Sequence, residues 1–281
     1  MKNKLRQYLH GNSYLSKTSL FIYRMLVSIK SININIDSLR EFRSLQSGFV
    51  DLSYGNYKSY SNVLPGLIAF LVDERMKPVI LDVGANDGWF AKIVYRFLGK
   101  ETLVISFEPL KSMSQKLQAI AIRYKSYQYE SYALGSTSEV IEITEYDTTG
   151  LSSLKEFSPS YQYSQDNYLT NPISKYPVNV VTLDWYLEKN RFENPIILKV
   201  DTQGFELEVL KGATKALSSG KIKAVIIEVM TIQKYSNAAL YNDIFDLLHS
   251  HGYVLYDLYQ SYYESNGMLS EFDCAFILKK Y

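Results

Sequence analysis

The stretch LKVDTQGFELEVLKGA, residues 198–213, joins a buried strand to an amphipathic helix. It continues an apolar run that starts at Ile196, and the sequence turns polar at Asp201. From Phe205 onward, apolar and charged residues follow one another at helical spacing. A continuous apolar strand that leads into a helix is typical of a parallel sheet covered on both faces. Ligands bind beyond the carboxyl ends of such strands, so Asp201 marks a candidate site.

The chain from Pro78 onward alternates strand and helix patterns. We expect strands at 79–83, 103–107, 128–133, 140–146, 178–181, 196–200, 224–229, 253–258 and 275–278. Besides the helix of the opening stretch, we expect helices at 88–98, 112–122, 183–189 and 238–251. The last two strands have no helix between them, which predicts a doubly wound α/β sheet that ends in an antiparallel hairpin. The segment 147–177 is expected to be irregular and to cover the site, because long irregular segments in compact domains are often functional.

The composition excludes several classes of protein. The 281-residue chain has one cysteine, three histidines and a formal net charge of +1. One cysteine rules out an internal disulfide framework and Cys-cluster metal sites, and it is typical of a reducing compartment, so we expect a cytoplasmic protein. The near-neutral charge gives no sign of a nucleic-acid-binding surface.

The N-terminus has an uneven charge. Residues 1–36 hold six basic side chains and no acidic one. Arg24 and Lys30 interrupt the apolar runs, which argues against a transmembrane helix, and no signal-peptide cleavage site follows. We expect residues 1–62 to form a basic helical extension and residues 63–281 to form one domain. The extension either packs on that domain or on a second copy in a homodimer, or it contacts the inner membrane face peripherally.

A first ligand site is predicted at LDVGANDGWF, residues 81–90. Gly84 and Gly88 flank the turn from strand to helix, where glycine lets the backbone approach a ligand and the helix N-terminus favours an anion. Glu108 ends the next strand, 24 residues after Gly84. A carboxylate at that place can accept both hydrogen bonds of a ribose diol, so the crevice is expected to bind a nucleoside.

The loop departs from the dinucleotide-binding fingerprint, because the second glycine of G-x-G-x-x-G is missing. Asp82 and Asp87 add negative charge, which is unfavourable beside a pyrophosphate and favourable beside an amino group and a sulfonium. Asn86 and the helix N-terminus suit a carboxylate. These features predict S-adenosylmethionine (SAM) as the ligand. The alternative for Asp82 and Asn86 is that they cap the following helix.

Six stretches resemble the FkbM-type SAM-dependent methyltransferases: VILDVGANDGWF, ISFEP, VTLDWYL, LKVDTQGFELEVLKGA, AVIIEV and DCAFIL. The resemblance covers about residues 78 to 280, and its most specific part is the pattern D-x-x-G-x-E-x-x-x-L-x-G-A. It implies a seven-stranded, mostly parallel class I methyltransferase fold of Rossmann-like type. It also implies SAM as the methyl donor and, in most members, O-methylation of a hydroxyl on a macrolide or a sugar.

The resemblance also assigns the cofactor contacts. The pair Tyr132–Ala133 occupies the place where such enzymes usually line the adenine, although an acidic residue often stands in place of Tyr132. The candidate SAM-binding residues are Asp82, Gly84, Ala85, Asn86, Asp87, Gly88, Glu108, Tyr132 and Ala133.

The opening stretch should hold the reaction centre, because its strand lies across the topological switch from the SAM strand. Asp201 is the first candidate for a general base that takes the proton of an acceptor hydroxyl. Glu228, at the end of the next strand, is the second. Glu206 is the third, with stabilisation of the helix dipole as its alternative role. The three carboxylates could also hold Mg²⁺, but nothing fixes an octahedral ligand set, so no metal site is predicted.

The sequence therefore predicts a SAM-dependent O-methyltransferase that acts on a hydroxyl of a glycan or a small natural product. The alternative is a SAM- or glycan-binding protein without turnover. Hydroxyl-bearing side chains of the segment 147–177 could bind a sugar, although tyrosine clusters also arise by chance in a chain with 25 tyrosines. Those side chains are Ser152, Ser153, Tyr161, Tyr163, Tyr168 and Tyr176.

Overall fold

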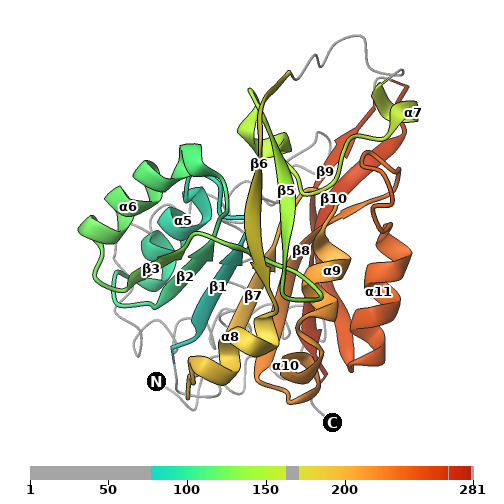
Figure 1. Ribbon diagram of the computed structural model, residues 1–281. Helices are drawn as coiled ribbons and strands as arrows, with labels where there is room; N and C mark the ends of the chain where they lie inside the picture. Colours follow the sequence, from blue (N-terminus) through green and yellow to red (C-terminus); the bar gives the residue numbers. More distant parts are fainter. Residues whose placement is uncertain (1–76, 163–170, 265, 280–281) are drawn as a thin grey trace, which may run out of the picture.

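The computed structural model describes residues 77–162, 171–264 and 266–279 (Figure 1). The expected N-terminal extension, and the side chains of Tyr163 and Tyr168, lie outside these residues. The helices in the described part of the chain are all too short or too polar to span a bilayer.

A seven-stranded sheet forms the centre of the molecule, as predicted. Its strand order is β3-β2-β1-β7-β8-β10-β9, and β10 runs antiparallel to both of its neighbours. The chain order reverses between β1 and β7. The strands are β1 (Val79–Val83), β2 (Val104–Phe107), β3 (Tyr127–Glu130), β7 (Ile196–Val200), β8 (Ile222–Met230), β9 (Tyr253–Tyr263) and β10 (Leu269–Leu278).

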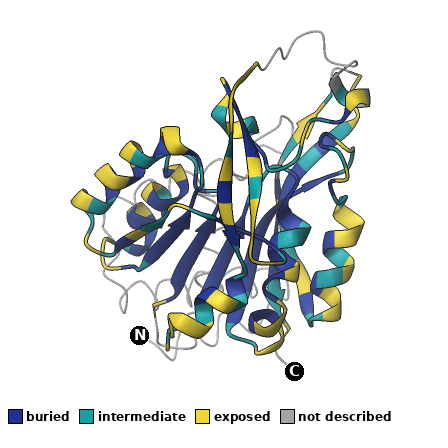
Figure 2. Ribbon diagram, viewed as in Figure 1, coloured by how far each residue is buried: buried dark blue, intermediate teal, exposed yellow. Residues whose placement is uncertain are grey.

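Helices cover both faces of this sheet, which explains why its inner strands are continuously apolar. On β1, Leu81 and Val83 face the cluster that contains α8, α9, α10 and α11, whereas Ile80 faces α5 and α6. The inner strands β1, β2 and β7 are buried along their whole length, and the outer helix faces are exposed (Figure 2). The helices are α5 (Trp89–Leu98), α6 (Ser114–Arg123), α8 (Leu183–Lys189), α9 (Glu206–Lys211), α10 (Thr214–Ser218) and α11 (Tyr241–Ser250), with a 3-10 turn η3 (Lys111–Met113) before α6.

A second sheet of three strands, in the order β4-β6-β5, crosses the front of the molecule (Figure 1). It contains β4 (Ala133–Leu134), β5 (Glu139–Tyr146) and β6 (Pro172–Val181). The prediction that residues 147–177 are wholly irregular was wrong, because residues 172–177 begin β6. Most of this part of β6 is exposed, so it lacks the apolar alternation that signals a strand, and pairing with β5 provides its order. Between the strands lie η4 (Thr149–Leu151) and α7 (Pro159–Gln162).

Other differences from the predictions are local. The helix expected from Ala238 starts at Tyr241, because residue Ala238 packs with Tyr235 in the preceding loop. The two tryptophans, Trp89 and Trp185, are large and apolar, yet they are 50% and 38% exposed. Each lies in the first turn of its helix, outside the stripe that the helix buries.

Candidate active site

An open cavity lies beyond the carboxyl ends of β1, β2 and β7. It opens where the strand order reverses, as expected for a ligand site in a doubly wound sheet. The wall combines apolar side chains of the sheet edge with polar groups from three loops. These include Gly84, Asn86, Phe107, Glu108, Leu110, Ala133, Leu134, Thr149, Gly150, Ser152, Ser153, Asp201, Thr202 and Gln203.

The loop between β1 and α5 forms one side of the cavity. Gly84, Asn86 and Gly88 all have left-handed backbones, with φ of 74°, 46° and 74°. A Cβ atom on Gly84 would lie 1.8 Å from the carbonyl oxygen of Asp201, so only glycine lets the ends of β1 and β7 touch. A Cβ on Gly88 would lie 2.3 Å from Cδ1 of Ile120, which makes Gly88 a packing position against α6.

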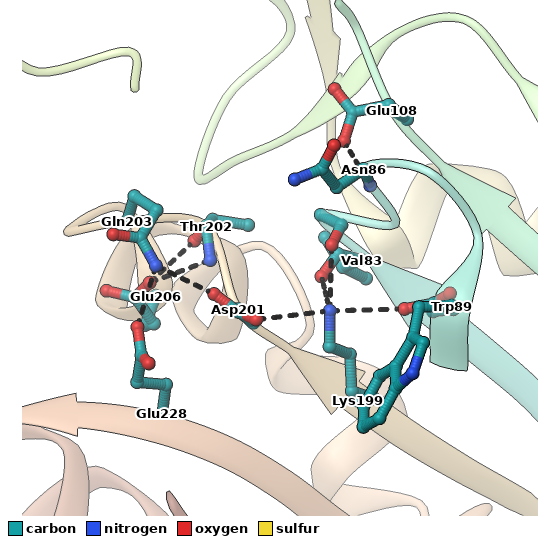
Figure 3. A network of polar contacts seen from close by, with 12 residues as sticks. Val83, Asn86, Trp89, Glu108, Lys199, Asp201, Thr202, Gln203, Glu206 and Glu228 are labelled. Atoms are coloured by element: carbon teal, nitrogen blue, oxygen red, sulfur yellow. Dashed lines mark hydrogen bonds and ion pairs between the residues drawn. The ribbon is translucent and has the colours of Figure 1, made fainter. Parts of the chain in front are cut away.

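Glu108 fixes the shape of this loop. Its carboxylate accepts the backbone N–H of Asn86 at 2.7 Å and that of Leu110 at 2.9 Å (Figure 3). Burial raises the pKa of Glu108 to about 7, against the opposing effect of these two hydrogen bonds. Two of about four acceptor positions of the carboxylate are used, so it can still accept hydrogen bonds from a ligand in the cavity.

Beneath the loop lies a buried ion-paired network. The Lys199 ammonium is 3.2 Å from Asp82 Oδ1 and 3.5 Å from Asp201 Oδ2, and it donates to the carbonyl oxygen of Gly84 at 2.7 Å. Burial lowers the pKa of Lys199, but the two carboxylates outweigh burial and raise it, so the lysine is charged. Asp82 is fully buried and does not line the cavity. It holds the lysine that ties the ends of β1 and β7 together.

Asp201 lies on the cavity wall next to Gly84, and 29% of its side chain is exposed. Its Oδ1 accepts a hydrogen bond from Nε2 of Gln203 at 3.0 Å, and the same amide nitrogen donates to Glu228 Oε2 at 2.8 Å (Figure 3). Glu228 is buried behind Gln203, and burial, followed by the charge of Asp201, raises its pKa well above the ordinary value. Asp201 is therefore the member of this pair that can meet a ligand.

Glu206 serves the loop between β7 and α9. Its Oε1 accepts the backbone N–H of Thr202 at 2.8 Å, and its carboxylate accepts the N–H of Gly204 at 3.0 Å. Burial raises the pKa of Glu206, and these hydrogen bonds oppose that effect. The side chain is buried and does not line the cavity, so its contacts are those of a structural carboxylate at a helix start.

Residues 149–154 complete the cavity from above. Thr149 Oγ1 donates to the side-chain oxygen of Asn86 at 3.2 Å, and Ser153 Oγ donates to the carbonyl of Gln203 at 2.7 Å. This segment therefore contacts both loops at the sheet edge. Of the side chains expected to bind a sugar, Ser152 and Ser153 line the cavity, whereas Tyr176 donates to Glu145 at 2.7 Å instead.

The structure brings together part of the predicted site. Gly84, Asn86, Glu108, Ala133 and Asp201 line one cavity. The other candidates lie outside the lining: Asp82, Ala85, Asp87, Gly88, Tyr132, Glu206 and Glu228.

The contacts of two of these candidates explain their placement. Asp87 accepts the backbone N–H of Trp89 at 3.0 Å at the start of α5, as a helix cap does. Tyr132 packs against the core with its ring 6.0 Å from that of Phe107. In the described ranges no group of three or more His, Cys, Asp or Glu side chains is arranged to hold a metal ion.

Sequence reasoning missed several residues at the site. Lys199 had a signal, since a lysine within the buried strand IILKV needs a buried partner. Gln203 also had one, as a polar residue in the loop after the strand. Thr149, Gly150 and Leu110 had none, because their place depends on contacts between distant parts of the chain.

Comparison with known proteins gives consistent matches. Residues 82–255 match the family model described as the methyltransferase FkbM domain. The hexuronic acid methyltransferase AglP of Haloferax volcanii is 28% identical over 165 residues, which are 58% of this chain and 61% of AglP. The chain thus matches about three fifths of the length of that curated relative.

Solved structures are more distant. An FkbM methyltransferase from Methylobacillus flagellatus KT is 16% identical with a TM-score of 0.45, over 86% of this chain and 60% of that one. Magnesium protoporphyrin IX methyltransferase of Synechocystis PCC 6803, solved with bound SAM, is 10% identical with a TM-score of 0.38, over 78% of this chain and 80% of that one.

Proposed function

Since the chain belongs to the FkbM methyltransferase family, we propose that it transfers a methyl group from SAM to a hydroxyl of a glycan or a small natural product. The observation that carries this proposal is the placement of two carboxylates, Glu108 and Asp201, on one cavity wall on either side of Gly84. One carboxylate suits a nucleoside diol and the other suits the proton of an acceptor hydroxyl.

The residues that line the cavity fit the three parts of SAM, namely its ribose, its adenine and its amino-acid end. Glu108 faces the cavity with unused acceptor capacity and would bind the ribose hydroxyls. Phe107, Ala133 and Leu134 supply apolar surface for the adenine. The loop Gly84–Asn86 would hold the amino-acid end of SAM. A residue larger than glycine at position 84 could not adopt the backbone conformation of this loop. When bound, SAM supplies an electrophilic methyl group.

Asp82 and Asp87, expected to meet the cationic groups of SAM, have other partners. Asp82 pairs with Lys199 and Asp87 caps α5, where it also lies 3.5 Å from the Lys92 ammonium. In this proposal their contribution is to hold the loop, and Asp201 is the carboxylate that faces the reacting groups.

Asp201 is the proposed general base. An alcohol is a weak nucleophile while it carries its proton, and Asp201 would accept that proton as the oxygen bonds to the methyl carbon and the methyl–sulfur bond breaks, with the sulfur leaving as a neutral thioether. Lys199 and Gln203 hold the two oxygens of Asp201 from the protein side. Positioned proton acceptors of this kind contribute about 10² to 10⁴-fold to a rate.

The acceptor class is proposed from the AglP relative, which is named a hexuronic acid methyltransferase. That name favours a hydroxyl-rich acceptor such as a sugar. We also propose a cytoplasmic location, from the single cysteine of the chain, and a role of residues 1–36 in packing, dimerisation or membrane contact, from the charge of that segment.

The test is methyl transfer itself. The full chain is incubated with SAM and a panel of sugars that includes hexuronic acids and neutral hexoses, and each acceptor is analysed by mass spectrometry for the gain of one methyl. Transfer to an oxygen is the expected result, and activity should survive EDTA. Binding of SAM with no transfer to any acceptor would favour a binding protein without turnover, and activity lost to EDTA and restored by Mg²⁺ would favour the metal mechanism.

A further inference from the structure

The backbone of Gln203 has a conformation that residues other than glycine rarely adopt. Its φ is 55°, in the left-handed region, and the next residue, Gly204, has φ of 95°. Such a conformation in a residue other than glycine costs of order 1 kcal/mol or more and persists only where the surroundings enforce it. Here Ser153 Oγ donates to the carbonyl of Gln203 at 2.7 Å and holds it in place.

The side chain of Gln203 uses every hydrogen-bonding group that it has. Its Nε2 donates to Asp201 at 3.0 Å and to Glu228 at 2.8 Å, and its Oε1 lies 3.1 Å from the hydroxyl of Tyr235. Turning the amide over would set Oε1 against two carboxylates, so the orientation is determined by its partners.

Tyr235 is a rigid support for this amide. It is fully buried, and its ring stacks on Phe157 with centroids 4.7 Å apart and an interplanar angle of 17°. Its single hydroxyl proton is shared between Gln203 Oε1 and the carbonyl of Leu151, which is 3.0 Å away, so the hydroxyl joins the covering segment to the loop after β7. The Cβ that Gly204 lacks would lie 3.1 Å from the Tyr235 ring, which explains why a glycine follows Gln203.

These contacts fix the orientation of the Asp201 carboxylate. Gln203 holds its Oδ1 and Lys199 lies beside its Oδ2, so both oxygens have a partner on the protein side. The carboxylate plane is then fixed while the side chain stays 29% exposed toward the cavity. We infer that Gln203, oriented by Tyr235, is the positioning residue that aims Asp201 at the acceptor hydroxyl and joins it to Glu228. This inference rests on the proposed function, in which Asp201 is the base.

Two variants remove the contact at different points. Gln203→Met keeps the length of the side chain and removes both donors, and Tyr235→Phe removes only the hydroxyl that orients the amide. Tyr253→Phe is a matched control, because Tyr253 is equally buried and donates to the carbonyl of Ile222 at 2.7 Å, at the opposite end of β8. It should lose a similar amount of stability and keep full activity.

With an acceptor found in the sugar panel, both site variants should bind SAM with about the affinity of wild type and lose about tenfold or more in kcat, since small misplacements of a reacting group cost that much. Tyr253→Phe should retain kcat within about twofold of wild type. The inference is overturned if folded Gln203→Met and Tyr235→Phe keep kcat and the pH profile of wild type, or if the control falls equally.

A second readout needs no acceptor. The side-chain carboxyl of Glu228 is followed by ¹³C NMR during a pH titration of the full chain, and Glu228→Gln identifies its signal. The Gln203 amide donates to Glu228 Oε2 at 2.8 Å and so favours the charged form of this carboxyl. Asp201, Glu206, Glu271 and Asp273 act on it in the opposite sense. Loss of the amide donor in Gln203→Met should therefore move the titration of Glu228 to higher pH. An unchanged titration overturns the inference. A shifted titration in a protein that methylates no acceptor instead removes the proposed function and leaves the contact standing.

Discussion

Two buried glutamates at the same edge of the sheet behave differently. Glu108 follows β2 and Glu206 begins α9, each is at most 5% exposed, and each accepts backbone N–H groups of a neighbouring loop. Only Glu108 lines the cavity. Burial and hydrogen bonding alone therefore do not distinguish a ligand-binding carboxylate from a structural one. What distinguishes them is whether the carboxylate keeps a face toward open space.

The largest effect is expected at the carboxylate that lies between these two. Asp201→Asn keeps the shape of the side chain and removes its ability to take a proton, so kcat should fall by about 10² to 10⁴-fold while SAM still binds. Steady-state kinetics and calorimetry on the same preparation measure both quantities. Normal turnover by Asp201→Asn would remove it as the base and would shift attention to Glu228.

The structural role of Glu206 predicts a loss of stability. Glu206→Ala leaves the N–H groups of Thr202 and Gly204 without an acceptor, which should lower the free energy of unfolding by about 3 to 4 kcal/mol. Urea denaturation measures this change. If the variant is as stable as wild type but inactive, Glu206 belongs to the reaction and the contrast with Glu108 is wrong.

The pKa of Glu108 predicts a pH dependence of stability. Its folded pKa of about 7 lies above the ordinary value of 4.5, so between these values the native state holds a proton that the unfolded state has released. The free energy of unfolding should therefore fall as pH rises through this window, by at most about 3 kcal/mol from this group. Glu108→Gln should lack this slope, which urea denaturation from pH 5 to 7.5 would reveal. Parallel curves for the two proteins would contradict the raised pKa.

The comparison also explains what the sequence could predict. Glu108 and Asp201 each end a strand of a parallel sheet, and the carboxyl ends of such strands meet, so their common cavity follows from local pattern. Asp82 lies one residue before the end of β1, yet it does not line the cavity and instead pairs with Lys199, 117 residues later. No local pattern contains that contact.

The covering segment shows the same limit. Its position over the site was predicted from its length and composition, and residues 149–154 do contact both loops. The role of Tyr235 was not predicted, because it depends on the left-handed backbone conformation of Gln203 and on the stacking of the Tyr235 ring against Phe157. The first part of β6, residues 172–177, was missed because mostly exposed residues form it through pairing with β5.

The central claim is that the cavity binds SAM through Glu108, and calorimetry on the full chain tests it most directly. Wild type should bind SAM and its demethylated product. Folded Glu108→Ala should bind SAM about tenfold or more weakly, because a charged acceptor to a neutral diol contributes ~1.5 to 3 kcal/mol. An equal affinity in the two proteins, or no binding by wild type at millimolar SAM, would contradict the claim.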